Sequence, residues 1–234
     1  MSATAIQAVL FDLDGTFADT APDLADALNK TLLAHQQSPL PFDLIRPVVS
    51  HGGKALIELG FQISEADPHF ESLRQELLAY YKQDLATHTQ VFAGLLPCIE
   101  QLVTQDIKWG IVTNKPAWLT DPLIVSLKLQ YAPCCVVSGD TIKERKPHPA
   151  PLLHACQLCD VQAANSVYVG DAQRDIIAGQ RAGMYTVVAG YGYIGVDDEP
   201  SDWQADAQIH HPEELIPLLA YLAQQPPKPC SYAS

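Results

Sequence analysis

The chain has 234 residues, of which 47% are hydrophobic, and it carries a formal net charge of −13 at pH 7. This length suits one large α/β domain with an inserted piece, and the apolar content is enough for a sizeable core. Nucleic acid is excluded as a partner, because a binder of backbone phosphates needs clustered Lys and Arg and the sequence has no basic stripe. Association with a membrane is not expected either, since no apolar stretch approaches the roughly 20 residues that span a bilayer.

Two features of the sequence bear on the compartment. The residues before the first predicted strand do not have the basic segment followed by an apolar segment that forms a secretory signal, so we expect a cytoplasmic protein. One C-x-x-C pair is present, but it lies late in a predicted helix and no second pair completes a zinc site. We therefore expect reduced, buried thiols that pack as small hydrophobic side chains. The cysteines concerned are Cys98, Cys134, Cys135, Cys156, Cys159 and Cys230.

The apolar residues predict a strand, then a helical stretch, then alternating strands and helices. The first strand covers residues 6–11, and the stretch that follows it has no strand signal. Apolar residues recur there at a helical period, and the helices expected are 22–36, 42–49, 53–59 and 68–85. The elements expected from residue 92 on are, in chain order, helix 95–105, strand 107–112, helix 119–129, strand 134–138, helix 150–159, strand 167–169, helix 172–182, strand 185–188, strand 207–209 and helix 212–223.

The alternation of strands and helices predicts an α/β fold with a Rossmann-like parallel sheet. The short strands are apolar throughout, which is typical of strands that helices cover on both faces. The helical stretch interrupts this pattern after the first strand, so we expect a small α-helical cap over one edge of the sheet. The expected domains are a core of residues 1–16 and 92–234 and a cap of residues 17–91.

Pairs of carboxylates directly follow two of the predicted strands. Asp12 and Asp14 come after the first strand, and Asp171 and Asp175 follow the strand at 167–169, one helical turn apart. The carboxyl ends of parallel strands meet at one edge of a sheet, where such folds bind ligands. Carboxylates gather there at large electrostatic cost unless a cation lies among them, and a hard cation suits oxygen ligands. Turn formation and helix capping are the alternative roles for single members of this set.

Two further segments supply groups that suit a phosphate. Thr113 and Asn114 follow the strand at 107–112 and offer a hydroxyl and backbone amides, although in isolation they are typical of a strand-end turn. Lys146 precedes Pro147 in a stiff stretch, and a fixed cation beside carboxylates suits an anionic substrate. The alternative for Lys146 is a solvated surface charge.

These segments together resemble the haloacid dehalogenase (HAD) superfamily, in the order and at the approximate spacing of its motifs. They are DLDGT at 12–16, TN at 113–114, KP at 146–147 and GDAQRD at 170–175, and the likeness covers nearly the whole chain. It implies a HAD core with a cap of the C1 type. Members that dehalogenate lack a carboxylate at the position of Asp14, so its presence favours a phosphatase that hydrolyses a small phosphate ester.

The resemblance implies a role for each residue of these motifs. Asp12 is the expected nucleophile, which forms an aspartyl-phosphate, and Asp14 is the expected general acid and base. Mg²⁺ is the expected cofactor, held by Asp12, Asp14 and Asp171, with Asp175 in support. The residues expected at the phosphoryl group are Thr16, which braces the nucleophile loop, Thr113, Asn114 and Lys146.

Substrate choice is expected in the cap, because caps close over the substrate and exclude water. The insertion resembles the small cap of the phosphoglycolate phosphatase branch. Its loop before the helix at 53–59 either contacts the substrate or serves as a helix–helix turn. Together with residues 109–116 and 191–194, this loop also resembles the corresponding segments of phosphatases that act on N-acetylmuramic acid 6-phosphate. We therefore favour this ester narrowly over 2-phosphoglycolate as the substrate. The loop residues are Ser50, His51, Gly52, Gly53 and Lys54.

Two other function classes share this pattern. A sugar phosphomutase has the same core and cap type, but it returns the phosphate to a sugar hydroxyl. A non-catalytic metabolite sensor keeps the pocket, although the intact set of carboxylates with Thr113 and Lys146 favours an enzyme. The sequence leaves open whether the protein is a monomer or a homodimer.

Overall fold

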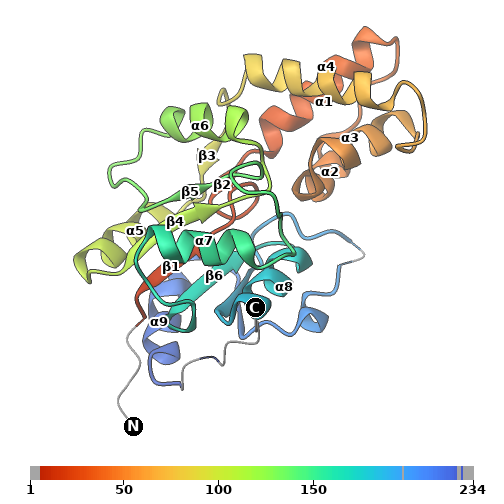
Figure 1. Ribbon diagram of the computed structural model, residues 1–234. Coiled ribbons are helices and arrows are strands. Elements are labelled where there is room, and N and C mark those ends of the chain that lie inside the picture. Colours follow the sequence, from red (N-terminus) through yellow and green to blue (C-terminus); the bar gives the residue numbers. More distant parts are fainter. Residues whose placement is uncertain (1–5, 197, 226–227, 229–234) are drawn as a thin grey trace.

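A parallel β-sheet of six strands forms the centre of the computed structural model, which describes residues 6–196, 198–225 and 228 (Figure 1). The strands lie in the order β5-β4-β1-β6-β7-β8, and every neighbouring pair is parallel. The predicted α/β fold with a parallel sheet is thus confirmed. The strands are β1 (Ala8–Phe11), β4 (Lys108–Val112), β5 (Val136–Val137), β6 (Ser166–Gly170), β7 (Tyr185–Ala189) and β8 (Ala207–Ile209).

Helices cover both faces of the sheet, because alternate residues of a strand point to opposite sides. On β1, Val9 and Phe11 share a core with α5, α6 and α9, whereas Leu10 shares one with α7 and α8. Within the described ranges, no helix is both long and apolar enough to cross a membrane. The helices and 3-10 turns of this region are α5 (Leu95–Thr104), α6 (Ala117–Ser126), α7 (Ala150–Leu158), η2 (Ala163–Asn165), α8 (Gln173–Ala182), η3 (Pro200–Trp203), η4 (Pro212–Glu214) and α9 (Leu215–Leu222).

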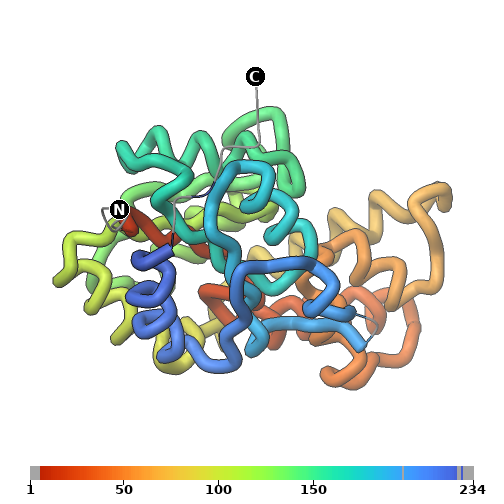
Figure 2. Tube along the Cα trace, turned by 90° about the horizontal axis from the view of Figure 1, so that it is seen from below, coloured from red at the N-terminus to blue at the C-terminus, as the bar shows by residue number. Residues whose placement is uncertain are grey.

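The helices between β1 and α5 form a separate lobe beyond the carboxyl ends of the strands (Figures 1 and 2). Leucines at the predicted helical spacing are buried inside it, among them Leu28 of α1 and Leu77 of α4. The lobe occupies the place expected of the cap, and the exact domain boundaries stay predictions. Its elements are α1 (Ala21–Ala34), α2 (Phe42–Ile45), η1 (Arg46–His51), α3 (Gly52–Phe61) and α4 (Phe70–Gln83).

The expectation that the cap region contains no strand is wrong for two short segments. β2 (Ala18–Asp19) and β3 (Gln90–Val91) form an antiparallel pair where the chain enters and leaves the lobe. Strands of two residues are too short to display an alternating pattern. The helix predicted at 42–49 is also divided, since α2 ends at Ile45 and a 3-10 turn containing Pro47, which has no N–H to donate, follows it.

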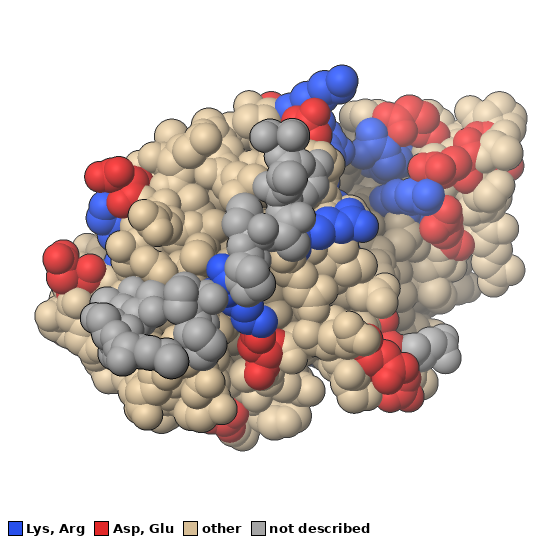
Figure 3. Space-filling view, turned by 60° about the horizontal axis from the view of Figure 1, so that its bottom comes forward, with Lys and Arg blue, Asp and Glu red and all other residues tan. Residues whose placement is uncertain are grey.

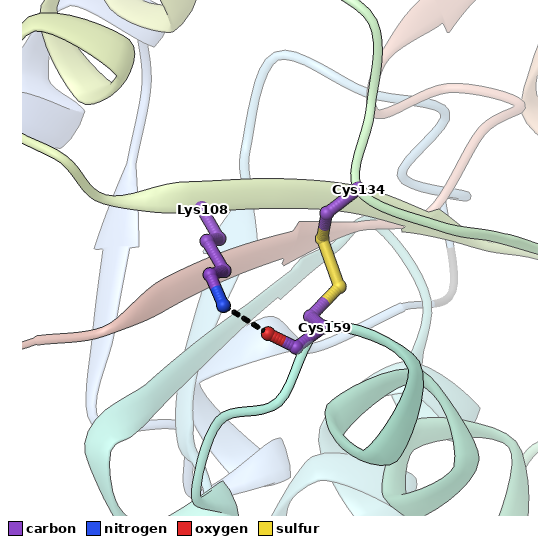
Figure 4. The surroundings of a disulfide bond; sticks show 3 residues. All are labelled: Lys108, Cys134 and Cys159. Carbon is purple, nitrogen blue, oxygen red and sulfur yellow. Dashed lines mark hydrogen bonds between the residues drawn. A yellow bond between two sulfur atoms is a disulfide. The ribbon is translucent and has the colours of Figure 1, made fainter.

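The prediction that all cysteines are reduced and buried is wrong for two of them. Cys134 and Cys159 form a disulfide, and Cys134 is exposed (Figure 4). The chain passes through β5 and α7 between them and brings their Cα atoms to 5.6 Å, a separation that a disulfide spans. Lys108 Nζ donates a hydrogen bond of 2.5 Å to the Cys159 carbonyl beside this bond. The prediction is confirmed for the buried free thiols Cys98, Cys135 and Cys156, and Cys230 lies outside the described residues.

Candidate functional site

Three carboxylates from two strand ends converge at the carboxyl edge of the sheet. Asp12 follows β1, Asp171 follows β6, and Asp175 lies in the first turn of α8. Because β1 and β6 are paired neighbours, their ends bring these side chains together. Carboxylate oxygens of the three residues all lie within 4.8 Å of one another, and each residue is at most 2% exposed. We call these three residues the carboxylate cluster.

The ammonium group of Lys146 lies inside the carboxylate cluster. Its Nζ donates hydrogen bonds to Asp12 Oδ1 (2.8 Å), the Val112 carbonyl (3.0 Å) and the Tyr168 hydroxyl (2.8 Å). It also lies 2.8 Å from Asp175 Oδ1, but that buried oxygen has no hydrogen-bond partner among the described residues. Lys146 is therefore a buried counter-ion of the cluster, and its contact with a phosphoryl group stays a prediction.

The ammonium of Lys146 and the nearby guanidinium of Arg174 together do not balance three buried carboxylates. Burial, reinforced by the charges of Asp12 and Asp175, raises the pKa of Asp171 to about 7. Burial also raises the pKa of Asp12, in spite of the ammonium of Lys146 beside it. Asp175 Oδ1, which accepts no hydrogen bond from the described residues, and the raised pKa values fit a hard divalent cation such as Mg²⁺, which would favour the ionised carboxylates. Gly15 leaves room for the cluster, because a Cβ at this φ of +82° would lie 2.1 Å from Asp171 Oδ2.

The fourth acidic candidate, Asp14, has a counter-ion of its own. Asp14 Oδ1 accepts hydrogen bonds from the Thr20 hydroxyl (2.6 Å) and the Lys115 ammonium (2.8 Å). Lys115 also donates to the hydroxyl of Tyr81 in α4 (2.9 Å), so the cap and the core meet at this ion pair. Sequence reasoning missed Lys115 and the second partner of its ammonium group, Tyr81. Lys115 could have been found because it follows Asn114 at the same strand end, whereas Tyr81 has no signal beyond the helical period.

The remaining motif residues hydrogen-bond within the site. The Thr16 hydroxyl donates to Asp171 Oδ1 (3.3 Å), and Thr113 Oγ1 accepts a backbone N–H from two residues further on (3.1 Å). The side chain of Asn114 exchanges two hydrogen bonds of 3.0 Å with the backbone of Lys146. Thr16 thus contacts a cluster carboxylate, and Asn114 holds the segment that carries the buried ammonium.

A cavity of about 660 Å³ lies between this edge of the sheet and the cap. Asp12, Asp14, Thr113 and Asn114 line it from the core, and all five residues of the predicted cap loop line it as well. Lys and Arg side chains gather at the junction of cap and core (Figure 3), although the chain is strongly acidic. The cavity therefore suits an anionic ligand. Its basic residues are Lys54, Arg74, Lys115, Arg145 and Arg174.

The cap loop is attached to the core by its first residue. Ser50 Oγ donates to Asp171 Oδ2 (2.6 Å), and Arg174 donates to the Ser50 carbonyl (2.7 Å). Burial, together with the charge of Arg174, lowers the pKa of His51. Gly52, at a φ of +76°, joins the 3-10 turn to α3. The loop is thus a helix–helix junction and a cavity wall at the same time, and its contact with a substrate stays a prediction.

Known proteins match this chain over most of its length. A family model described as haloacid dehalogenase-like hydrolase matches residues 9–189. An N-acetylmuramic acid 6-phosphate phosphatase of Pseudomonas putida is 38% identical over 90% of this chain and 94% of that protein. A phosphoglycolate phosphatase of Xanthomonas campestris pv. campestris is 41% identical over 89% of this chain and 94% of that protein. A solved structure from Haemophilus somnus, described as a predicted phosphoglycolate phosphatase, matches the fold with a TM-score of 0.80 at 23% identity, over 91% of this chain and 97% of that one.

Proposed function

Because the chain belongs to the haloacid dehalogenase-like hydrolase family and is a phosphatase, we propose that it hydrolyses a small phosphomonoester with Mg²⁺ through a phosphorylated Asp12. One observation carries this proposal. Of the three members of the carboxylate cluster, Asp12 alone also lines the cavity, and Asp14 lines it too. A substrate in the cavity therefore meets one cluster carboxylate as a nucleophile and a second carboxylate that can move a proton.

The reaction follows in two steps. An Asp12 oxygen attacks phosphorus while the bond from phosphorus to the leaving oxygen breaks, and Asp14 donates a proton to that oxygen. Water then attacks the phosphorus of phosphorylated Asp12, Asp14 takes the proton of the water, and inorganic phosphate leaves with the Asp12 carboxylate restored. Mg²⁺ would be held by Asp12, the main-chain carbonyl of Asp14 and Asp171, with Asp175 in support, and when bound it neutralises charge on the phosphoryl oxygens.

The other motif residues position the phosphoryl group. We assign the Thr113 hydroxyl, the Asn114 amide and the Lys146 ammonium to its oxygens, since phosphoryl transfer depends on positioning and on neutralised charge. The Lys146 ammonium lies 2.8 Å from an oxygen of the attacking Asp12 carboxylate. A phosphoryl group that moves onto Asp12 therefore comes within reach of this ammonium. We assign Thr16 to the nucleophile loop as its brace, and its hydroxyl also contacts Asp171.

The cap, residues 17–91, selects the leaving group in this proposal, and the substrate that we favour is N-acetylmuramic acid 6-phosphate. Relatives named for this ester and for phosphoglycolate match the chain at similar identity, 38% and 41%, so the names do not discriminate. The volume of about 660 Å³ supports the amino-sugar ester, because a leaving group of two carbons fills little of it. 2-Phosphoglycolate is the alternative substrate.

A panel of phosphate esters tests the proposal. Phosphate release is measured with Mg²⁺, and with a chelator as control, from N-acetylmuramic acid 6-phosphate, 2-phosphoglycolate, glucose 6-phosphate and p-nitrophenyl phosphate. We expect Mg²⁺-dependent release, with kcat/KM about a hundredfold higher for the first ester, which corresponds to ~2.7 kcal/mol of transition-state discrimination. The same advantage for 2-phosphoglycolate would establish the alternative substrate, and no release from any ester would refute the proposal.

A further inference from the structure

One wall of the cavity carries an exposed aromatic ring and an exposed guanidinium group that the proposed hydrolysis does not use. Trp118 lies in the first turn of α6, is 40% exposed and lines the cavity. Arg145 precedes Lys146 in the loop after β5, is exposed and lines the same cavity. Among the described residues, neither forms a hydrogen bond or an ion pair with the carboxylate cluster. We call these two residues the outer wall.

Hydrogen bonds hold the outer wall in a fixed relation to the strand ends. Asp140 Oδ1 accepts the N–H of Ala117, next to the tryptophan, at 2.8 Å. The Nε of Arg145 donates to the Gly139 carbonyl at 2.6 Å, and the N–H of Gly139 donates to the Lys115 carbonyl at 2.8 Å. The start of α6, the turn at 139–140 and the arginine therefore form one framework, which continues into the segment where the phosphoryl group is expected.

The guanidinium group of Arg145 is available for an anion. Its Nε is engaged, but across the part of the chain that the structure describes its terminal nitrogens have no hydrogen-bond partner and no carboxylate within 4.0 Å. Arg174 forms no ion pair within the described residues either, but its charge interacts with the carboxylate cluster and it donates to a cap carbonyl. The other basic side chains of the cavity are already paired: Lys54 with Glu65 at 3.0 Å, Arg74 with Glu71 at 2.7 Å and Lys115 with Asp14 at 2.8 Å.

The indole of Trp118 lies where the cap meets the core. The ammonium of Lys82, in cap helix α4, is 5.4 Å from the centre of its ring. A tryptophan that is 40% exposed beside a cavity offers a large flat apolar surface to a ligand. The apolar CH groups on one face of a pyranose ring match such a surface, whereas a leaving group of two carbons presents no face of this kind.

We propose that Trp118 and Arg145 form the subsite that recognises the leaving group of a sugar acid ester. The indole packs on one face of the sugar ring, and the terminal nitrogens of the guanidinium pair with the carboxylate of the sugar acid. A planar guanidinium matches a carboxylate in a bidentate pair, which gives specificity as well as affinity. This inference rests on the proposed function for the place of the phosphoryl group, and it identifies the residues that distinguish a sugar acid from a plain sugar.

Binding to a variant that does not turn over tests the arginine. In the Asp12→Asn background, calorimetry gives the Kd of N-acetylmuramic acid 6-phosphate and of N-acetylglucosamine 6-phosphate, which has the same ring without the lactyl ether that carries the carboxylate. We expect the acid to bind at least about tenfold more tightly, and Arg145→Gln to remove this advantage while the Kd of the neutral sugar ester stays within about twofold. Lys143→Gln removes an exposed charge from the same loop outside the cavity and should change neither Kd.

The outcomes for Arg145 separate the possible contacts. Equal weakening of both esters by Arg145→Gln would show that the guanidinium binds the phosphoryl group, and would overturn the inference. An unchanged preference for the acid would overturn it as well. Because these are binding constants, they decide the subsite even if the wild-type protein releases no phosphate from any ester, which is the result that refutes the proposed function.

The same background tests the ring. Trp118→Ala should weaken the binding of both sugar esters about tenfold and leave that of 2-phosphoglycolate within about twofold, whereas Trp118→Phe should retain most of the affinity. Tyr221→Ala removes an exposed aromatic ring on α9 outside the cavity and should have no effect. Equal losses on all three esters, or no loss on any of them, would overturn the role of the ring.

Discussion

The carboxylate cluster and the outer wall of the cavity are built in opposite ways. Asp12, Asp171 and Asp175 with Lys146 are at most 3% exposed, and their positions follow from neighbouring strands and from the ion pairs of Lys146 with Asp12 and Asp175. Trp118 and Arg145 are exposed and lie on a helix start and a loop. The proposed chemistry is thus tied to the sheet, whereas the residues that we propose to meet the leaving group can vary without disturbing the core.

The largest expected effect comes from the one cluster residue that lines the cavity. Asp12→Asn should lower kcat by about 10⁴-fold or more, because the amide is no nucleophile, with the fold unchanged by circular dichroism. Asp140→Asn is a matched control, since Asp140 lines the same cavity and asparagine can still accept its hydrogen bond. Phosphate release from the control should stay within about threefold. Similar losses in both variants would remove the special role of Asp12.

The second effect is on stability and tests whether the cluster depends on its counter-ion. Lys146→Met leaves Asp12 and Asp175 without the buried ammonium, so the free energy of unfolding of the Mg²⁺-free protein should fall by about 3–5 kcal/mol. Lys143→Met, an exposed lysine in the same loop, should cost less than about 0.5 kcal/mol. Both values come from urea unfolding, and equal values would contradict the buried counter-ion.

The pH dependence of stability tests the charge imbalance in the cluster. The pKa of Asp171 is raised from 3.8 to about 7, so between these values the folded, metal-free protein binds a proton that the unfolded chain does not. The free energy of unfolding should therefore fall as the pH rises through this window, by a few kcal/mol at most. The Asp171→Asn variant has no carboxyl group that titrates at this position. The pH dependence of the difference in Tm between the wild type and this variant therefore reports the titration of Asp171. A difference that does not change between pH 4 and 7 would contradict the raised pKa.

Loss of the disulfide is expected to have a smaller effect, which falls on stability and not on turnover. Cys134 and Cys159 enclose the segment that carries Arg145 and Lys146. Cys134→Ser should lower the free energy of unfolding by about 3 kcal/mol for a loop of this length. Its kcat should stay within about twofold, because Lys146 is also held by Asn114 and by the cluster. A large fall in kcat with unchanged stability would show that the disulfide positions the site.

Sequence reasoning located three acidic residues that meet at the ends of the strands. The parallel sheet is confirmed, and the structure brings Asp12, Asp171 and Asp175 together as their positions after apolar strands predicted. Local patterns suffice there, because the carboxyl ends of neighbouring parallel strands share one edge.

Contacts between distant segments could not be predicted in this way. Lys115, the counter-ion of Asp14, also donates to Tyr81, and these two residues come from opposite sides of the boundary between cap and core. The disulfide joins residues 25 positions apart, whereas the sequence drew attention to the local C-x-x-C pair. In each case the deciding interaction is set by tertiary packing, which a single sequence does not display.

The central claim is that Asp12 carries the phosphoryl group during turnover. The most direct test is rapid acid quenching of the enzyme during turnover of N-acetylmuramic acid 6-phosphate with Mg²⁺, followed by peptide mass spectrometry. We expect a phosphoryl group on the peptide that contains Asp12, formed within the first turnover and absent when the Mg²⁺ is chelated. Phosphate release without any phosphorylated peptide, or with the phosphoryl group on another residue, would contradict the account.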